Sequence, residues 1–400
     1  MKRTTILMLL DHNYPTDQRV ENEARSLANA GFKVIVLSIG KDERALEEDF
    51  EGTKIIRVGM PIWLRQKLRG AVGFLNIYSH IIAFFASRVF QKYPFDAVHA
   101  HDLYLGKAGI ILKEKYNIPL TLDLHENYVE ALSEYAWSSR FPGNLFISIN
   151  KWKTLEKNWL NKADLIVTVI KEMKEKYINE GIPEEKLIIT PNTPDIISFR
   201  AFDVQDQIIS KFKDRQVLLY SGGFDLHRGL SVAIDAMELV KEKHADSLLL
   251  LVGDGRNREE LETQVKNKGL SDYVVFEGWQ LQDTIRSYVR GADIGLIPHI
   301  RSVQTDASIP HKLGYYMSEK LPVITSNCTS LERMVTDYNA GKVFESGNSK
   351  DLAKQIIYLL SNKEEAIQLG INGKVAAEKD FNWNATVLPL VDYYRSISAK

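Results

Sequence analysis

Short runs of consecutive apolar residues alternate with segments of helical period along most of the chain. Residues that are apolar at consecutive positions are typical of parallel strands buried on both faces, and the amphipathic segments between them supply covering helices. The segment after the first run places Val20, Ala24 and Leu27 on one side of a helix. Gly31 can end this helix. The pattern predicts an α/β fold that opens with a βαβ unit. The expected strands of the first half are 4–10, 33–39, 97–101, 120–125, 164–169 and 187–190.

A break in this pattern divides the chain. From Pro191 to Gln216 the sequence is polar and weakly periodic, and it starts with Pro-Asn-Thr-Pro-Asp, which is typical of a linker. A chain of 400 residues is also too long for one ordinary open α/β sheet. We therefore predict two doubly wound, Rossmann-like domains, 1–195 and 196–382, with ligands at the carboxyl ends of their strands, in a cleft between the domains. The expected strands of the second half are 216–221, 247–253, 273–277, 293–298, 322–326 and 342–344.

The composition narrows the class of protein. Hydrophobic residues make up 44% of the chain and charged residues 26%, as in a soluble globular protein. The net charge of -1, from 51 basic and 52 acidic residues, argues against a nucleic-acid partner. The single cysteine, Cys328, excludes an internal disulfide framework and a cysteine-based zinc cluster. The apolar run at the N-terminus is too short for a signal peptide, so we expect a cytoplasmic protein.

One segment, 63–90, does not fit a plain sheet-and-helix domain. It mixes large apolar side chains with basic ones, and charge interrupts it too often for a membrane span. Two interpretations remain open. A basic amphipathic surface could make peripheral contact with the anionic inner surface of a membrane, or two helices could face the core and carry a solvated basic rim. The basic residues of the segment are Arg65, Lys67, Arg69 and Arg88.

The stretch from Tyr220 to Leu230 reads Tyr-Ser-Gly-Gly-Phe-Asp-Leu-His-Arg-Gly-Leu. A predicted strand ends at Gly222 and Gly223, which let backbone N–H groups approach a ligand without an intervening side chain. A helix is expected to start near Arg228, and its N-terminal amides and dipole favour an anion. The Arg228 guanidinium suits phosphate oxygens. These residues predict an anion seat, although Arg228 could instead pair with a surface carboxylate.

Two further segments of the second half are expected at the same edge of the predicted sheet as the turn at Gly222 and Gly223. Leu251-Val-Gly-Asp-Gly255 lacks the third glycine of a dinucleotide fingerprint, but it fits a strand-to-turn connection beside a nucleotide. In 308–317, polar groups precede a helix, where Lys312 is a candidate phosphate cation and Tyr315 or Tyr316 could contact a ribose or base. Either tyrosine could equally be a packing residue. The predicted donor-binding set is Gly222, Gly223, Arg228, Gly253, Phe276, Pro298, Ser308, Lys312 and Tyr315.

In the first half, His99-Ala-His-Asp102 and Asp123-Leu-His-Glu-Asn127 both lie at the ends of predicted strands. Such side chains are good zinc or manganese ligands, so a metallohydrolase is one interpretation. Because no third ligand cluster and no His-Glu-x-x-His helix appears, we favour recognition of a polyhydroxylated acceptor and predict no metal site. The loop 11–17 also follows a strand, and Asp17 is a candidate N-cap for the next helix. The predicted acceptor-binding set is Asn13, His101, Asp102, Glu126 and Asn127.

Taken in order, these segments resemble the retaining GT-B glycosyltransferases of family four. The resemblance covers nearly the whole chain, and it is the order and spacing of the motifs together that make it specific. The first half carries it in DQRVENEARSLANAGFKVIVLS, HAHD, DLHENY, ADLIVTVIKEMKEKY and PNTPD. The second half carries it in SGGFDLHRGL, LLLLVGDG, VVFEGW, ADIGLIPH and PHKLGYYMSEKLPVITS.

The resemblance implies a GT-B fold, with a UDP- or GDP-linked sugar donor bound as substrate in the second domain and a saccharide or lipid-linked acceptor in the first. It implies transfer with retention, in polysaccharide or glycoconjugate synthesis, without a cofactor or a catalytic metal. Helix-terminal amides and basic side chains would stabilise the departing nucleoside diphosphate. His125 matches the family histidine that contacts the reacting sugar, and is the predicted catalytic residue. Arg228 matches the basic phosphate-binding position, and 383–400 resembles the closing helix that packs back on the first domain.

The chain departs from the family pattern at the donor site. Gly223 stands where the family commonly has an arginine, and the usual pair of glutamates with seven residues between them is missing. Tyr315 replaces the second glutamate, and the first falls near Ala307. Two alternative functions follow, a catalytically silent relative that binds a sugar nucleotide or glycan, and a GT-B epimerase of sugar nucleotides. Nearby polar residues that could compensate for the glutamates are Asp306, Ser308 and Glu319.

Overall fold

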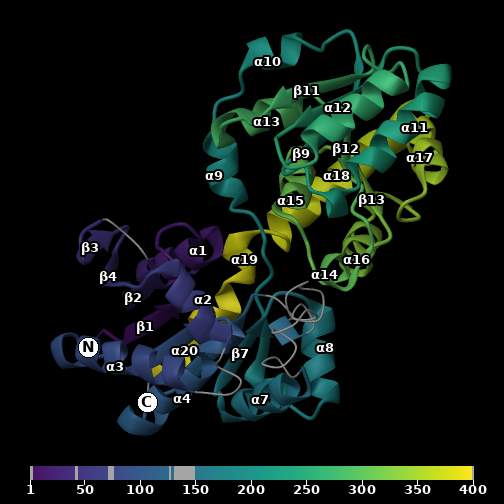
Figure 1. Ribbon diagram of the computed structural model, residues 1–400. Helices are drawn as coiled ribbons and strands as arrows, with labels where there is room; N and C mark the ends of the chain where they lie inside the picture. The colour runs from purple at the N-terminus through teal and green to yellow at the C-terminus, as the bar shows by residue number, and fades with distance from the viewer. Residues whose placement is uncertain (1–2, 41–43, 71–75, 126–127, 130–148, 399–400) are drawn as a thin grey trace. The chain divides into compact units, whose positions relative to one another are not determined.

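The computed structural model describes residues 3–40, 44–70, 76–125, 128–129 and 149–398. The chain forms two compact units (Figure 1). The first unit contains Met1–Pro191 and Val387–Lys400, and the second contains Asn192–Thr386. The sequence analysis predicted that the chain passes from the first unit to the second after residue 195 and returns to the first unit at residue 383. Each unit is described by itself below.

The first unit is built on an eight-stranded sheet with the order β3-β4-β2-β1-β5-β6-β7-β8. Every pair is parallel except the edge pair of β3 and β4, which is antiparallel. Chain order reverses between β1 and β5, and this is the position where open α/β sheets bind ligands. The strands are β1 (Thr5–Leu10), β2 (Lys33–Gly40), β3 (Glu47–Phe50), β4 (Thr53–Gly59), β5 (Ala97–His101), β6 (Leu120–Leu124), β7 (Leu165–Thr168) and β8 (Leu187–Ile189).

The sequence analysis missed β3 and β4. In β4 the buried residues alternate with half-exposed ones, and the strand contains only two consecutive apolar residues, Ile55 and Ile56. Strand β3 is short and acidic, and none of its residues is buried. Neither strand therefore has the continuous apolar run that is typical of a strand buried on both faces.

The sheet of the first unit is accompanied by helices that include α1 (Gln18–Asn29) and α3 (Ile77–Lys92). Asp17 is the N-cap of α1, as predicted, because its side chain accepts hydrogen bonds from the Arg19 and Val20 amides. In α3 the buried positions include Tyr78, Ile82, Ala86 and Val89, which recur at helical spacing. The remaining helices are α2 (Ile62–Gly70), α4 (Gly106–Tyr116), α7 (Ile149–Lys162), α8 (Lys171–Asn179) and α20 (Leu388–Ser398), with 3-10 turns η1 (Leu103–Leu105) and η2 (Glu184–Lys186).

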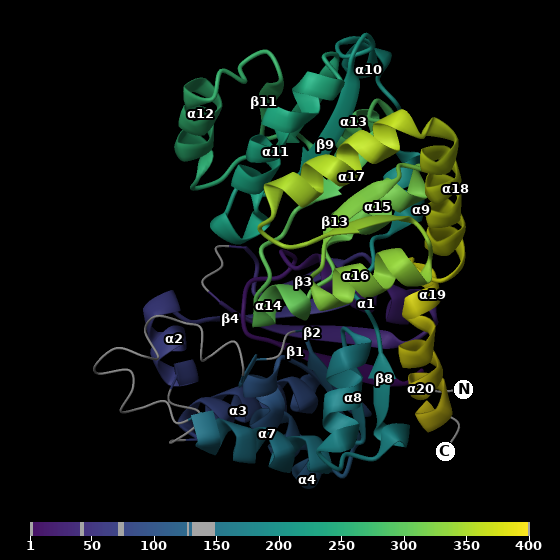
Figure 2. The ribbon, with the colours of Figure 1, turned by 90° about the vertical axis from the view of Figure 1, so that its right-hand side faces the viewer.

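The C-terminal helix α20 is part of the first unit, which confirms the predicted return. It lies beside β8 (Figure 2). The Tyr394 hydroxyl is 3.1 Å from Nδ1 of His99 and donates to Oγ1 of Thr121 at 3.0 Å, so the helix is joined to the middle of the sheet by polar contacts. Among the described helices, none has the length and apolar character that a membrane crossing requires.

The second unit has a six-stranded parallel sheet with the order β11-β10-β9-β12-β13-β14. Chain order reverses between β9 and β12, so the loops after these two strands flank the expected ligand position. All six strands match runs predicted from the sequence. They are β9 (Gln216–Ser221), β10 (Ser247–Val252), β11 (Val274–Gly278), β12 (Ile294–Ile297), β13 (Val323–Ser326) and β14 (Gly341–Phe344).

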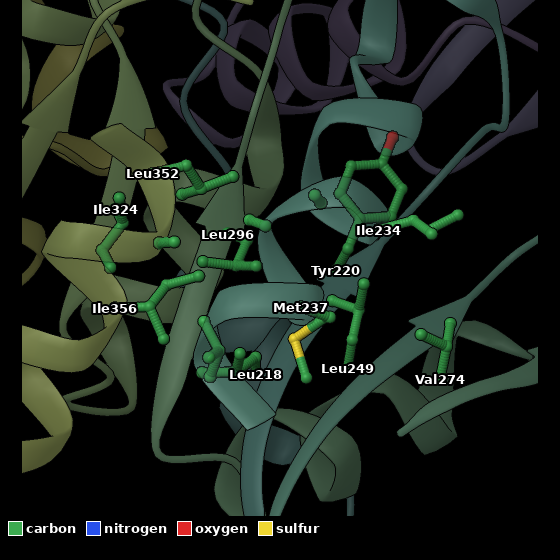
Figure 3. Packing of buried hydrophobic residues seen from close by; sticks show 14 of the residues in the cluster. Leu218, Tyr220, Ile234, Met237, Leu249, Val274, Leu296, Ile324, Leu352 and Ile356 are labelled. Atoms are coloured by element: carbon green, nitrogen blue, oxygen red, sulfur yellow. The ribbon is translucent and has the colours of Figure 1, made fainter. Parts of the chain in front are cut away.

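The hydrophobic core of the second unit includes residues of β9 and α11, the strand and the helix that the turn after β9 connects. Side chains of β9, β10 and β12 pack against α11 (Leu230–Lys243) and α17 (Ser349–Ser361), as Figure 3 shows. Leu218 and Tyr220 come from β9, and Ile234 and Met237 from α11. The other helices are α9 (Ile196–Ala201), α10 (Asp206–Ser210), α12 (Arg258–Asn267), α13 (Gln282–Arg290), α14 (Val303–Asp306), α15 (His311–Ser318), α16 (Thr329–Asp337), α18 (Lys363–Lys379) and α19 (Trp383–Thr386), with the 3-10 turn η3 (Leu226–Arg228).

Candidate active site

In the first unit, His125 follows β6 and lies next to the end of β5. Its Nε2 atom is 3.0 Å from Nδ1 of His101 and 3.3 Å from Oδ2 of Asp123. Its Nδ1 atom faces Oδ1 of Asp102 at 3.9 Å. Burial opposes the imidazolium, but the carboxylates of Asp102 and Asp123 outweigh it and raise the pKa of His125 to about 9. With 14% of its side chain exposed, His125 is a charged group that a ligand can reach.

Asp102 has an uncommon backbone conformation, with φ at 69° and ψ at 148°. Few residues other than glycine adopt a positive φ, and such strain is concentrated at functional sites. Two contacts hold the residue in place. Its amide donates to the Asp123 carbonyl at 2.8 Å, and its Oδ2 accepts from the Tyr104 hydroxyl at 2.7 Å. The other carboxylate oxygen is thereby left facing His125.

The remaining predicted acceptor residues that the structure describes are not gathered at one accessible surface. His101 is fully buried under His125, so the structure does not bring its side chain to a surface where an acceptor could bind. Asn13 is half-buried after β1 and packs against Gly40, where any Cβ would lie 1.9 Å from its Oδ1. Glu126 and Asn127 lie outside the described residues.

Arg19, Glu23 and Asp123 form a buried charged cluster. The sequence analysis assigned no role to Arg19 or Glu23, and it considered Asp123 only within the metal-binding alternative. Nη2 of Arg19 donates to Oδ1 of Asp123 at 2.9 Å and lies 3.0 Å from Oε1 of Glu23. The available signal was the spacing of Arg19 and Glu23, which puts two charges four residues apart beside the apolar positions of α1. Glu23, His99, His101 and Asp123 also offer metal-ligand atoms that lie within 4.8 Å of one another.

In the second unit, the turns after β9 and β10 touch backbone to backbone. Gly222 has φ at 135° and Gly253 has φ at 142°, which favours glycine at both positions. A Cβ on Gly253 would lie 2.0 Å from the Gly222 carbonyl oxygen, so no side chain fits there. A Cβ on Gly222 would lie 2.8 Å from Nζ of Lys312. The predicted glycines therefore allow a lysine ammonium to sit directly under the turn.

Arg228 and Lys312 form a pair of cations at this turn. Nζ of Lys312 is buried, lies 3.5 Å from the centre of the Tyr220 ring, and has no hydrogen-bond partner among the described residues. Within the described part of the chain, neither cation has a carboxylate at ion-pair distance, so the alternative pairing of Arg228 with a surface carboxylate is not found. Burial and the nearby Arg228 lower the pKa of Lys312 well below its usual value. Two basic side chains without a counter-ion among the described residues are suited to binding an anion.

His299 orients Arg228. Nη1 of Arg228 lies 3.2 Å from Nε2 of His299, at hydrogen-bond distance. Burial and the positive charges of Lys312 and Arg228 lower the pKa of His299 to about 2. The imidazole is therefore neutral and can accept on Nε2 from the guanidinium. The sequence analysis missed this residue, which follows β12 and is far from Arg228 along the chain.

The other predicted donor residues do not all point to this seat. Tyr315 stacks on Phe199 of α9, with ring centres 4.2 Å apart, whereas the Tyr316 hydroxyl accepts from the Ser221 amide at 2.9 Å. Phe276 packs edge-on against Phe224 with a centroid distance of 6.1 Å. The carbonyl of Pro298 packs on Gly229, and Ser308 is half-buried between α14 and α15.

Two acidic residues that could have replaced the missing glutamates are engaged elsewhere. Oε1 of Glu319 accepts from Arg286 at 2.9 Å, and its other oxygen is 3.6 Å from Arg290. Asp306 accepts from the Thr329 amide at 2.7 Å. Glu319 follows α15, at the end of that helix away from Lys312. The suggested compensation by Glu319 is therefore wrong, because its buried carboxylate is committed to partly exposed arginines.

Comparison with known proteins agrees with this arrangement. The model of "Glycosyltransferase Family 4" matches residues 17–196, and the model of "Glycosyl transferases group 1" matches residues 202–376. The amylovoran biosynthesis glycosyltransferase AmsK of Erwinia amylovora is 23% identical over 222 residues, which are 55% of this chain and 53% of AmsK. The alignment thus spans about half the length of AmsK.

Two other similarities extend over most of the chain. The alpha-monoglucosyldiacylglycerol synthase of Acholeplasma laidlawii is 22% identical over 383 residues, covering 90% of this chain and 88% of that protein. The crystal structure of HepE from Anabaena in complex with UDP superposes with a TM-score of 0.73 at 15% identity, covering 98% and 100% of the two chains. Both halves of the chain match a glycosyltransferase family. The HepE structure shares the fold along 98% of the chain. The chain belongs to the GT-B glycosyltransferases.

Proposed function

We propose that this protein transfers a sugar from a UDP- or GDP-linked donor to a saccharide or lipid-linked acceptor, with retention, in the synthesis of a surface polysaccharide or glycoconjugate. The observation that carries the proposal is the pair of Arg228 and Lys312, two cations without a counter-ion among the described residues, at the switch point of the second sheet. A nucleoside diphosphate supplies the missing negative charge. The acceptor would bind in the first unit, near Asp102 and His125.

The anion seat depends mainly on side chains. In the turn after β9, the amides of Gly222, Phe224, Arg228 and Gly229 already donate to backbone carbonyls. Few amide donors of the turn therefore remain for a phosphate. The guanidinium of Arg228, oriented by His299, and the ammonium of Lys312 then stabilise the charge that develops on the leaving diphosphate. We propose that these fixed cations take the place of a metal ion.

A catalytically silent sugar-nucleotide binder is the second candidate function. It is favoured by the position of Tyr315, which replaces a family glutamate and stacks on Phe199 rather than offering a carboxylate to the donor. Slow hydrolysis or transfer of one sugar from a panel of UDP- and GDP-sugars, with the anomer of the product determined by NMR, supports the transferase. Nucleotide binding without turnover of any donor supports the silent binder.

We expect UDP or GDP to raise the melting temperature of the wild-type protein, equally with and without EDTA. Arg228→Ala should weaken this stabilisation, because it removes a charge-assisted hydrogen bond worth about 1.5 kcal/mol, which is roughly tenfold in affinity. Arg290→Ala is the matched control, since Arg290 ends α13 near Glu319 and away from the turn. Undiminished stabilisation of Arg228→Ala would contradict the phosphate assignment, and stabilisation only with added divalent metal would contradict the metal-free seat.

We also propose that α2 and α3 rest on an anionic lipid surface, at the cytoplasmic side of a membrane. Trp63 is 61% exposed and Phe84 is 55% exposed, and a basic side chain lies over each ring, Lys67 at 5.5 Å and Arg88 at 5.7 Å. In α3 the buried positions form a separate face, so the core-facing interpretation explains one side of the helix only.

Flotation with lipid vesicles tests this surface. The wild type should float with vesicles that contain phosphatidylglycerol and much less with phosphatidylcholine alone. The double substitution Trp63→Ser and Phe84→Ser should lose most of this binding, whereas Leu388→Ser, an exposed apolar residue of α20, should not. Equal binding of all three proteins would rule out this surface as the lipid contact.

A further inference from the structure

A layer of buried polar side chains lies beneath His125. We call it the buried charge layer, and it consists of Arg19, Glu23, His99, His101 and Asp123. Arg19 joins Glu23 to Asp123. The guanidinium donates to both oxygens of Asp123, at 2.9 and 3.3 Å, and to the Thr190 carbonyl at 2.7 Å. Tyr394 of α20 closes the layer on the far side through His99.

We propose that Asp123 and Arg19 are positioning residues for His125, which hold its imidazole with a proton on Nε2 so that Nδ1, beside Asp102, is the atom presented to the substrate. The proposal rests on the proposed function, in which His125 contacts the reacting sugar. It concerns how the fold prepares this histidine, and it assigns a task to buried residues that bind no ligand themselves.

The proton on Nε2 follows from the Asp123 carboxylate. An ionised carboxylate only accepts hydrogen bonds, so Nε2 at 3.3 Å from Oδ2 of Asp123 must carry a hydrogen. Nδ1 of His101 lies 3.0 Å from the same Nε2 atom and 3.4 Å from the same Asp123 oxygen. Burial and the proximity of His99 lower the pKa of His101 to about 3, so its ring is neutral and adds no positive charge beside Nε2. Asp123 is therefore the neighbour that holds the proton on Nε2.

Arg19 keeps Asp123 ionised. A fully buried carboxyl group would normally take up a proton, because burial disfavours its charge. At Asp123 the guanidinium of Arg19 and the ring of His125 outweigh burial and hold the pKa well below its usual value. Glu23 behaves in the opposite way, because burial and the charge of Asp123 raise its pKa well above the usual value. The negative charge of the layer is therefore concentrated on the residue that touches His125.

The side of His125 that faces away from the buried charge layer has room for a substrate hydroxyl. Nδ1 is 3.9 Å from Oδ1 of Asp102, and both side chains are partly exposed, at 14% and 17%. A sugar hydroxyl at about 2.8 Å from each of the two atoms fits this gap. Among the described residues, Asp17 at the start of α1 also acts on His125 through its charge, and it pairs with His12 at 3.3 Å. The backbone of Asp102, with its positive φ, directs the carboxylate toward Nδ1 of His125.

The same cluster has the ligand types of a metal site, and the position of Arg19 argues against that use. Glu23, His99, His101 and Asp123 could surround an ion. However, Arg19 already lies 3.0 Å from Glu23 and 2.9 Å from Asp123, so a divalent ion would be placed beside a buried positive charge. The layer is better explained as a support for His125.

NMR of protein with 15N-labelled histidine tests the proposal without any substrate. The His125 signals are identified by their loss in His125→Gln. In the wild type, the neutral form of His125 should show the Nε2–H tautomer, with a pKa well above 6.5. In Asp123→Asn the pKa should fall by at least about one unit, because one unit corresponds to ~1.4 kcal/mol and a direct carboxylate contact is lost. Glu156→Gln is the matched control, since it removes another buried carboxylate of the first unit, which bonds to Tyr177 at 2.8 Å.

An Nδ1–H tautomer of the neutral form of wild-type His125, observed at a pH above its pKa, overturns the proposal, and this measurement does not depend on any variant folding. An unchanged pKa of His125 in folded Asp123→Asn also overturns it, as does a shift of the His99 or His101 signals on addition of Zn²⁺ or Mn²⁺. In the transfer assay, the pH profile of kcat/KM for Asp123→Asn should move together with the pKa of His125, while stabilisation by nucleotide stays unchanged. If no donor is turned over by the wild type, the proposed function fails, and the tautomer still decides the positioning role.

Discussion

His125→Ala is expected to lower the rate of sugar transfer by about 10²–10⁴-fold, the usual contribution of a positioned acid–base or hydrogen-bonding side chain. The imidazole is charged at neutral pH, because Asp102 and Asp123 raise its pKa to about 9, and it is the exposed end of a buried polar cluster. Alanine leaves the proposed acceptor site in the first unit without this group. The measurement is kcat with the donor that gives the highest turnover in the wild type.

Stabilisation by nucleotide should survive this substitution, since the anion seat is built from residues of the second unit. His80→Ala is the matched control, because His80 is an exposed histidine on α3 of the same unit. A variant that binds nucleotide and keeps full turnover would remove His125 from the mechanism. A variant that loses nucleotide binding as well would instead indicate that His125 takes part in holding the donor.

Lys312→Met is expected to have opposite effects on binding and on stability. A unit charge about 5 Å from a bound phosphate contributes ~3 kcal/mol at an effective dielectric constant near 20, so nucleotide affinity should fall roughly 100-fold. Without nucleotide, the variant should melt at a higher temperature than the wild type. The buried amine has no hydrogen-bond acceptor among the described residues, and methionine fills a similar volume without a polar group.

Titration calorimetry with the nucleotide that stabilises the wild type, together with thermal melts of the free proteins, separates the two effects. Lys354→Met, at an exposed position of α17, should change neither quantity. Unaltered affinity in Lys312→Met would show that the lysine belongs to the core rather than to the anion seat. A lower melting temperature of the free variant would show that Lys312 has a stabilising partner in the absence of ligand.

The anion seat illustrates which features can be read from local sequence. The run before Gly222 is apolar at consecutive positions, and the positions after Gly229 are apolar at helical spacing, so the strand, the turn and α11 were all predicted. Glycine at position 222 was expected to let a ligand approach the backbone, whereas the close contact between Gly253 and the Gly222 carbonyl was not predicted. The contact between His299 and Arg228 at this turn was not predicted. His299 follows a different strand, and it reaches Arg228 only because β9 and β12 are neighbours in the sheet.

The tyrosines of α15 show the limit of helical periodicity. Tyr315 and Tyr316 are adjacent in sequence and both seemed suited to a ligand, but one stacks on Phe199 and the other bonds to Ser221. Their directions depend on which elements pack against each face of the helix. Glu319 was a candidate replacement for the missing family glutamates because it lies nearby in sequence, and its arginine partners come from α13 and α9, which no local pattern connects to it.

The sequence by itself determined the two α/β units, the glycine turns and the edge where polar residues gather, because each of these depends on residues close together in the chain. Strand pairing, burial and side-chain direction were decided only by the tertiary structure. Arg19 and Asp123 are 104 positions apart, and they meet because the first turn of α1 reaches Asp123 in β6, which pairs with β5. A buried charge is stable only with its partner, so the task of each residue in this layer could be assigned only once the fold had brought them together.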